Sequence, residues 1–390
     1  MTKTVKQKIY LSLITLLFLF VILVLGGGWY FADMIEKDGL KIDHSEDPLD
    51  LLIVDFPTIT GSSITLTSAR PDENDLEDLR RYSRWGLVSE SASGYLNELI
   101  SENSEKHITR KFTVVSGNFK KGDLVRLDRS VFSNPTNIPG VKNNKTITVE
   151  GPLGPLTAWL IPPFNQESMS NKWAILVHGR TADKKEALRT IPALAASGFT
   201  TLIINYRNDL GTTPDPSGYY QFGRTEWADI EPFVKYATKN DGNTILLGGF
   251  SMGGSIVVNF MLKSTLANEI DLLFLNSPML DFGSTVDLGA RERGVPGFIT
   301  WTAKLISSLR FSINWGELNY LTKTEMIRIP ILLIHGDKDD TVPVETSRAL
   351  ALQSPELVNY FEFEGANHVA SWNSNPELYE QIVKSFLLNQ

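Results

Sequence analysis

One serine of this chain lies among glycines, between two apolar segments. Gly249-Phe250-Ser251-Met252-Gly253 has the pattern G-x-S-x-G and stands between the strand-like TILLGG and the helix-like SIVVNFML. A sharp strand-to-helix turn of this kind holds its serine in an unfavourable backbone conformation and exposes the hydroxyl group. The neighbouring positions must be glycine, because a Cβ there would collide with the strand and the helix. This context predicts that Ser251 is a nucleophile.

A serine hydroxyl is a weak nucleophile and needs a base, for which histidine is suited. The sequence has five histidines. His44 and His107 lie far upstream of the serine. His178 and His335 each end a strand-like segment, where the ring more often packs beneath the following loop. His368 remains, in GANHVASWN after the last predicted strand, and we expect it to be the general base.

The base needs a carboxylate that fixes its tautomer and stabilises its charged form. The segment HGDKDDTVP offers Asp337, Asp339 and Asp340, all directly after a predicted strand. Asp281, after the strand-like DLLFLNS, is a fourth candidate. Spacing alone does not choose among these four carboxylates.

The elements around these residues predict how they could meet. From residue 146 on, apolar strand-like segments alternate with segments of helical length, and the strands are expected at Trp173–His178, Thr200–Tyr206, Thr244–Gly249, Asp271–Ser277, Ile329–His335 and Val358–Phe363. This alternation indicates an α/β fold, a mostly parallel sheet with helices on both faces. Chemistry in such sheets collects at the carboxyl ends of the strands, where the candidate residues are expected.

From about Trp173 to its end, the chain resembles an α/β-hydrolase. The chain order serine, aspartate, histidine is the order of that fold. Its acid loop usually reads G-x-x-D-x-x-V, which fits Gly336, Asp339 and Val342 and implies Asp339 as the acid. The segment His178-Gly179-Arg180 is similar to the family's oxyanion loop.

The resemblance also implies a mechanism. The backbone N–H groups of Arg180 and Met252 would stabilise an oxyanion while Ser251, His368 and Asp339 transfer an acyl group. No metal or organic cofactor is implied. The segments HGRTADKKEALR, NYRND, GRTEWAD, GFSMGG and HVASWN together resemble predicted bacterial membrane-anchored α/β-hydrolases, whose substrates this resemblance does not specify.

The N-terminus fits a membrane anchor. Residues 1–8 are basic, residues 9–32 carry no charge, and Asp33, Glu36 and Asp38 follow. A helix over this run would reach about 36 Å, enough to cross a hydrocarbon core of about 30 Å. The run is longer than the apolar region of a cleaved signal peptide, which is the alternative. The charges predict a cytoplasmic N-terminus and an extracytoplasmic catalytic domain in a single-pass protein of the cell membrane.

The rest of the chain divides by pattern into a polar linker at 33–48, a β-rich module at 49–145 and an α/β-hydrolase domain at 146–390. The module is expected to hold strands at Leu49–Phe56, Ser63–Ser68, Ile108–Val115 and Asp123–Asp128, and a short helix within Pro71–Arg81. Residues 281–323 are expected to cap the site. Their large apolar side chains would line an acyl pocket or pack inside the cap: Phe298, Trp301, Leu305, Phe311 and Trp315.

The composition argues against two classes of function. A net charge of −8 argues against nucleic acid as a partner, and the absence of cysteine excludes thiol chemistry. Arg207 is expected to pair with Asp229 or Glu226, although it could bind substrate.

We expect a membrane-tethered serine hydrolase, esterase- or lipase-like, that cleaves carboxylic esters or thioesters of a small-molecule or lipid-like acyl substrate. The alternatives are a serine peptidase on the same fold and a catalytically silent membrane-anchored binding protein.

Overall fold

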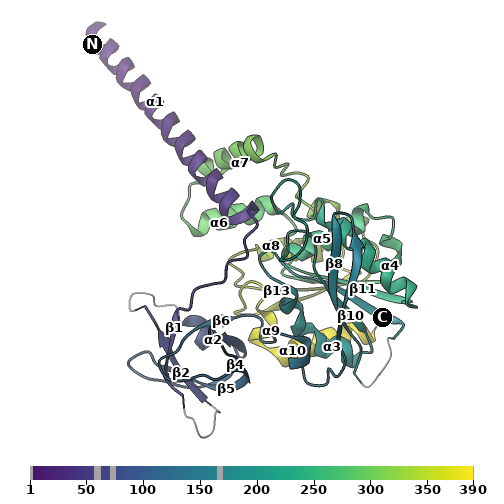
Figure 1. Ribbon diagram of the computed structural model, residues 1–390. Helices are drawn as coiled ribbons and strands as arrows, with labels where there is room; N and C mark the ends of the chain where they lie inside the picture. Colours follow the sequence, from purple (N-terminus) through teal and green to yellow (C-terminus); the bar gives the residue numbers. More distant parts are fainter. Residues whose placement is uncertain (1–2, 57–62, 71–75, 165–169, 390) are drawn as a thin grey trace.

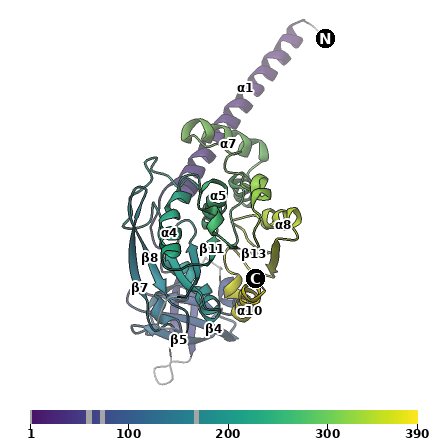
Figure 2. The ribbon, with the colours of Figure 1, turned by 90° about the vertical axis from the view of Figure 1, so that its right-hand side faces the viewer.

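The computed structural model describes residues 3–56, 63–70, 76–164 and 170–389. Figure 1 shows a long N-terminal helix, a small β-barrel and a larger α/β part. In Figure 1 and in the turned view of Figure 2, the barrel lies at the end of the molecule away from the N-terminus. The long helix and the barrel therefore leave the α/β part in different directions.

Six antiparallel strands form the closed barrel, in the order β1-β2-β5-β4-β3-β6. They are β1 (Leu51–Asp55), β2 (Ser63–Ser68), β3 (Trp85–Val88), β4 (Ser93–Glu102), β5 (Ile108–Ser116) and β6 (Leu124–Asp128). The predicted β-rich module is confirmed, although β3 and β4 were not anticipated. A short helix, α2 (Glu77–Arg81), lies where one was expected, and residues 71–75 of that segment lie outside the described residues.

The α/β part is built on one sheet of eight strands, in the order β14-β13-β12-β11-β9-β10-β8-β7. The six predicted strands are present and parallel: β9 (Lys172–Val177), β10 (Thr200–Ile204), β11 (Thr244–Phe250), β12 (Leu272–Asn276), β13 (Ile331–Gly336) and β14 (Val358–Phe363). Two unpredicted strands, β7 (Lys145–Gly151) and β8 (Gly154–Ile161), extend one edge as an antiparallel hairpin. The mostly parallel sheet is therefore confirmed.

Strand β9 shows why these strands are apolar throughout. Trp173, Ile175 and Val177 belong to the core on one face of the sheet, and Ala174 and Leu176 to the core on the other. The first core is covered by α4 (Glu231–Lys239), α5 (Met252–Lys263) and α8 (Val344–Gln353). The second is covered by α3 (Ile191–Ala196) and α10 (Pro376–Leu388). A sheet buried on both faces needs apolar residues at successive positions.

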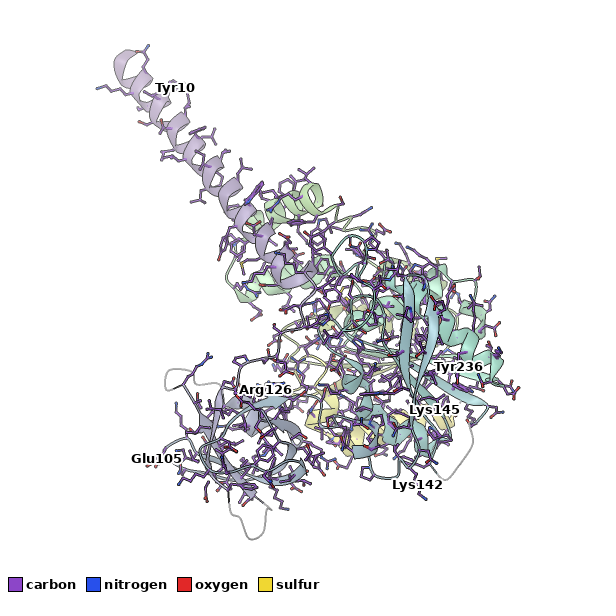
Figure 3. All side chains as sticks on the ribbon, viewed as in Figure 1. Tyr10, Glu105, Arg126, Lys142, Lys145 and Tyr236 are labelled. Carbon is purple, nitrogen blue, oxygen red and sulfur yellow. The ribbon has the colours of Figure 1, made fainter. Side chains whose placement is uncertain are left out.

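The N-terminal helix α1 (Lys3–Met34) continues into a six-residue π-helical turn, η1 (Ile35–Leu40). It is long and apolar enough to cross a membrane, judged by length and composition. In Figure 3, Tyr10 lies on the part of α1 that stands away from every other element. Such an apolar surface is unusual for a protein that is entirely in water.

Two helices between β12 and β13 lie beside the lower half of α1: α6 (Phe282–Glu292) and α7 (Gly297–Phe311) (Figure 1). The predicted roles of Phe298, Trp301 and Leu305 are wrong, because all three side chains are exposed. They neither line a pocket nor pack inside the cap, since α7 turns other residues toward the protein. Trp315 does pack, with its ring stacked 5.5 Å from that of Phe282. Phe311 is partly buried against the same core.

Candidate active site

Ser251 lies in the turn between β11 and α5, as its sequence context predicts. Its φ of 51° and ψ of −119° are unfavourable for a residue with a side chain. The flanking glycines are required by contact: a Cβ on Gly249 would lie 2.4 Å from the carbonyl carbon of Gly253. A Cβ on Gly253 would lie 2.2 Å from the backbone oxygen of Val177. The close approach of strand and helix thus holds Ser251 at the carboxyl edge of the sheet.

His368 lies between Ser251 and Asp339. Its Nε2 is 2.8 Å from the Ser251 Oγ, and its Nδ1 is 2.7 Å from Oδ2 of Asp339. Both distances are those of hydrogen bonds. With Nδ1–H donating to the carboxylate, Nε2 is left to accept the proton of the serine hydroxyl. The hydrogen-bonded chain runs from a hydroxyl to a carboxylate through one imidazole, the arrangement that activates a serine.

Asp339 accepts three further hydrogen bonds that sequence reasoning did not anticipate. Its Oδ2 also accepts from Nε2 of His335 at 3.0 Å, and its Oδ1 accepts from the backbone N–H groups of Thr341 and Val342. Burial alone would raise the pKa of Asp339, but the charge of His368 and the hydrogen bonds from both histidines hold that pKa well below its usual range. The group is therefore a stable anion in the folded protein.

The three other candidate acids are engaged elsewhere. Asp337 accepts from the backbone N–H of Gly365 at 2.6 Å. Asp340 is exposed and pairs with the side chain of Asn367. Asp281 caps α6, where its Oδ1 accepts from the N–H of Gly283 at 2.9 Å. Of the four carboxylates, the described hydrogen bonds join only Asp339 to His368.

His178 and His335 are buried beneath loops, as expected from their strand-end positions. Nε2 of His178 lies 2.9 Å from Oδ2 of Asp209. Burial lowers the pKa of His178, but the charge and hydrogen bond of Asp209 outweigh it and raise the pKa to about 9. His335 binds the hydroxyl of Ser347 through Nδ1 and Oδ2 of Asp339 through Nε2, which is the same oxygen that His368 binds. The sequence signal for this contact is a histidine four residues before an aspartate at a strand end.

Arg180 and Met252, whose backbone N–H groups were predicted to bind an oxyanion, both line the cavity that contains Ser251. Met252 is the first residue of α5, so its N–H has no partner within the helix. Within the described ranges, no hydrogen bond uses the N–H of either residue. Gly179 brings the Arg180 loop close, because a Cβ on it would lie 3.0 Å from the Cβ of Ser251. Both N–H groups are thus free to bind an anion.

The barrel holds the loop that carries His368. The N–H of Asn367 donates to the hydroxyl of Tyr82 at 2.9 Å, and Nη1 of Arg129 donates to the carbonyl of His368 at 2.9 Å. Ala370 is buried in the apolar core of the barrel. The barrel therefore positions the imidazole through the backbone on both sides of it, a role that no sequence motif revealed.

Non-glycine residues with positive φ gather around the site. Besides Ser251, they include Thr181 at 57°, Ser277 at 45° and Val369 at 53°. For the β-branched Thr181 and Val369 this conformation is strongly disfavoured and needs support from its surroundings. Arg189 supplies it for Val369, whose carbonyl accepts from Nη1 of Arg189 at 2.6 Å. The fold thus maintains strain on the loops that bring the polar groups together.

A cavity of about 330 Å³ opens beside Ser251. Its walls come from distant parts of the chain and are mainly apolar, and they include Phe31, Ile35, Phe282, Val286 and Ala303. Ser251, Met252 and Arg180 also line it. A volume of this size suits a small molecule or an acyl chain.

Arg207 is confirmed as a bracing residue. It forms a two-point pair with Asp229, with Nε and Nη2 each 2.8 Å from a carboxylate oxygen. A further contact joins its Nη1 to Asp215 at 3.2 Å. All three side chains are buried, so Arg207 ties the loop after β10 to the start of α4.

The sequence profile of the alpha/beta hydrolase family matches residues 174–382, a range that includes Ser251, Asp339 and His368. The chain belongs to the alpha/beta hydrolase family. Membership agrees with the eight-stranded sheet and with the serine in its strand-to-helix turn. It assigns the fold and the general class of hydrolases to this chain, and the resemblance noted from the sequence is confirmed.

Three similar proteins differ from this chain at most positions. The uncharacterized protein YqkD of Bacillus subtilis (strain 168) is 22% identical over 219 residues, which make up 55% of this chain and 70% of YqkD. The esterase Pf2001 of Pyrococcus furiosus is 24% identical, with a TM-score of 0.50 over 63% of this chain and 91% of the esterase. DcsB, solved in complex with a substrate analogue, is 14% identical, with a TM-score of 0.50 over 63% of this chain and 99% of DcsB. At these identities the likeness is one of fold.

Proposed function

We propose that the protein is a membrane-tethered serine hydrolase that cleaves carboxylic esters through Ser251, His368 and Asp339. The observation that supports this proposal is the hydrogen-bonded chain from Ser251 to Asp339, with 2.8 and 2.7 Å between its polar atoms, whose serine lines a mainly apolar cavity. The esterase among the structures of similar fold agrees with it.

In the first half of the reaction, Oγ of Ser251 attacks the ester carbonyl carbon, and its proton passes to Nε2 of His368. The negative oxygen that forms accepts hydrogen bonds from the N–H groups of Arg180 and Met252. Each such donor stabilises the transition state by about 2.7–4 kcal/mol in comparable sites. The bond to the alcohol then breaks, and His368 gives its proton to the leaving oxygen.

In the second half, water attacks the acyl-enzyme while Nε2 of His368 takes a proton from it. The bond from the acyl carbon to Oγ breaks, Ser251 regains the proton, and a carboxylic acid leaves. Asp339 stays ionised throughout and stabilises the imidazolium that forms twice.

The membrane tether is a separate proposal, supported by the length and apolar composition of α1. Lysines precede the run and acidic residues follow it, which favours a cytoplasmic N-terminus and an extracytoplasmic catalytic domain. The intact protein should remain in the membrane fraction through carbonate washes. Protease added outside the cytoplasm should digest or release the catalytic domain. Protection of that domain would reverse the orientation.

The activity is tested with the purified full-length chain in detergent, assayed on aryl esters, thioesters and peptides with Ser251→Ala as the control. We expect hydrolysis of the esters that is lost in Ser251→Ala. Cleavage of peptides in preference to esters would replace the proposal with a peptidase on the same fold. An absence of turnover on all three classes, with no covalent labelling of Ser251, would favour a silent binding protein.

A further inference from the structure

Helix α7 presents a row of large apolar side chains to the outside. Phe298, Trp301, Leu305 and Leu309 recur at spacings of three and four, so they lie on one face of the helix. Their exposed fractions run from 48% for Leu305 to 79% for Leu309. A water-exposed protein surface rarely carries four such residues in one row. We therefore expect these four side chains, hereafter the α7 stripe, to contact an apolar medium.

The contact between α7 and α1 indicates which apolar medium the α7 stripe meets. A Cβ on Gly28 of α1 would lie 2.5 Å from the side chain of Thr302, so the two helices are in close contact. The rings of Phe20 and Phe298 are 5.9 Å apart, near one end of this contact. Near the other end, Arg310 binds Asp33 at 2.5 Å. Helix α7 thus packs against the half of α1 that is nearer the α/β part, and Figures 1 and 2 show it beside that half, crossing α1 at an angle.

The depth of this contact matches one leaflet of a bilayer. The Arg310–Asp33 pair marks the aqueous end, because charges are costly in hydrocarbon. Phe20 precedes Asp33 by thirteen positions, so at 1.5 Å per residue it lies about 20 Å farther along α1, and half of a hydrocarbon core is about 15 Å. The charged Lys304 of α7 faces away from the stripe and binds Asp287 of α6 at 2.7 Å. The stripe itself carries no charge.

The opposite side of α7 lines the cavity at Ser251. Thr300 and Ala303 of α7 contribute to one wall, and Phe31 and Met34 of α1 contribute to another. The same two helices that would meet the lipid therefore enclose the space in front of the serine. An acyl chain that leaves the leaflet beside them would need to move only past α7 or α1 to reach Oγ.

We propose that the α7 stripe lies in the leaflet that faces the catalytic domain, and that Ser251 receives its substrate, an acyl ester of a membrane lipid, from that leaflet through the cavity between α1, α6 and α7. The helix α1 is then both an anchor and a wall of the substrate site. The chemistry at Ser251 rests on the proposed function, whereas insertion of the stripe does not.

Insertion can be measured without turnover. Because the chain has no cysteine, Trp301→Cys in the full-length protein gives one attachment site for an environment-sensitive fluorophore. The control is Leu352→Cys, an apolar residue that is 82% exposed on α8, a helix that stands apart from α1 in Figure 2. In phosphatidylcholine vesicles, spin-labelled lipids should quench the fluorophore at 301 and leave the one at 352 unquenched. Equal access of iodide from water to both positions would overturn the proposal.

Delivery from the leaflet is tested with two esters in the same vesicles, a soluble short-chain ester and a long-chain ester dissolved in the bilayer. The double variant Trp301→Lys with Leu305→Lys should lower hydrolysis of the bilayer ester by about tenfold or more, because lysine is strongly disfavoured in hydrocarbon. Hydrolysis of the soluble ester should stay within about twofold, as it should for both esters in the control Leu352→Lys.

The outcomes separate the two proposals. Equal loss on both esters would show damage to the fold and not to delivery, and would overturn the inference. A wild-type protein that hydrolyses the soluble ester but never the bilayer ester would also overturn it, while leaving the proposed function intact. Failure on both esters would contradict the proposed function, and quenching at position 301 would still decide whether the stripe is inserted.

Discussion

Replacing Asp339 with asparagine should remove nearly all activity while leaving the fold in place. Oδ1 of Asp339 accepts from the N–H groups of Thr341 and Val342, so the amide oxygen of an asparagine will take that position. The amide NH₂ must then replace Oδ2, which lies 2.7 Å from Nδ1 of His368. A donor facing Nδ1 forces the imidazole proton onto Nε2. That tautomer cannot accept the proton of Ser251.

The expected loss of activity follows from this change of the His368 tautomer. The same change of acid to amide in a serine protease triad lowers kcat by about 10⁴, which corresponds to about 5.4 kcal/mol in the activation barrier. His335 can adapt, because its Nδ1 binds a hydroxyl group that is able to donate or accept. We therefore expect kcat to fall by about 10⁴ with little change in KM, measured on an aryl ester with the full-length chain.

Asp337→Asn and Asp340→Asn are the matched controls, since both lie in the same loop and neither is bonded to His368. Each should keep kcat within about tenfold of the wild type. The reasoning is refuted if Asp339→Asn retains more than about a tenth of the wild-type kcat, or if Asp281→Asn proves the more damaging change.

Three further predictions concern the support of the site. The raised pKa of His178, about 9, means that its contribution to stability is complete below about pH 6.5 and is lost as the pH rises through 9. Removing the partner charge in Asp209→Asn should therefore flatten the fall of Tm between pH 6.5 and 9.5, and an unchanged fall would contradict this assignment. Tyr82→Phe removes the acceptor for the N–H of Asn367 and should lower kcat by about ten- to hundredfold with KM unchanged, whereas a loss of Tm alone would limit Tyr82 to a structural role. Gly28→Val should lower the Tm in detergent because its side chain would overlap Thr302, and Gly26→Val, with no atom within 4 Å, should leave it unchanged; equal effects would contradict the packing of α1 on α7.

Local pattern was sufficient for the central sheet. Strands buried on both faces are apolar at successive positions, and this signal identified the five strands from β9 to β13 before any contact was known. The sixth predicted strand, β14, lies at an edge and was recognised although polar residues interrupt it. The hairpin of β7 and β8 was missed because it lies at the edge, where polar residues alternate with apolar ones and a strand resembles a loop. In the barrel, Gly86 and Gly94 weaken the pattern of β3 and β4.

The residues of the hydrogen-bonded chain were predictable because each follows a strand end in a short, recognisable segment. The residues that support them could not be predicted, because this support depends on contacts between distant parts of the sequence. His335 was expected only to pack beneath a loop, yet it also binds Asp339. Tyr82 meets Asn367 across 285 positions of sequence. No local pattern encodes such a pairing.

The cap shows the same limit of sequence reasoning, here for an apolar helix face. Phe298, Trp301 and Leu305 have the spacing of a buried helix face, and sequence reasoning placed that face inside the protein. The structure turns it outward, because α1 occupies the neighbouring face of α7 at Gly27 and Gly28. An amphipathic pattern identifies an apolar face but not the medium that covers it.

The most direct test of the account is to locate the covalent adduct of a fluorophosphonate on the full-length protein by mass spectrometry of its peptides. The account predicts a single adduct, on Ser251, that forms in the wild type and is absent from a folded Ser251→Ala variant. An adduct on another serine, labelling that persists in Ser251→Ala, or no adduct on the wild type would contradict the claim that Ser251 is the nucleophile.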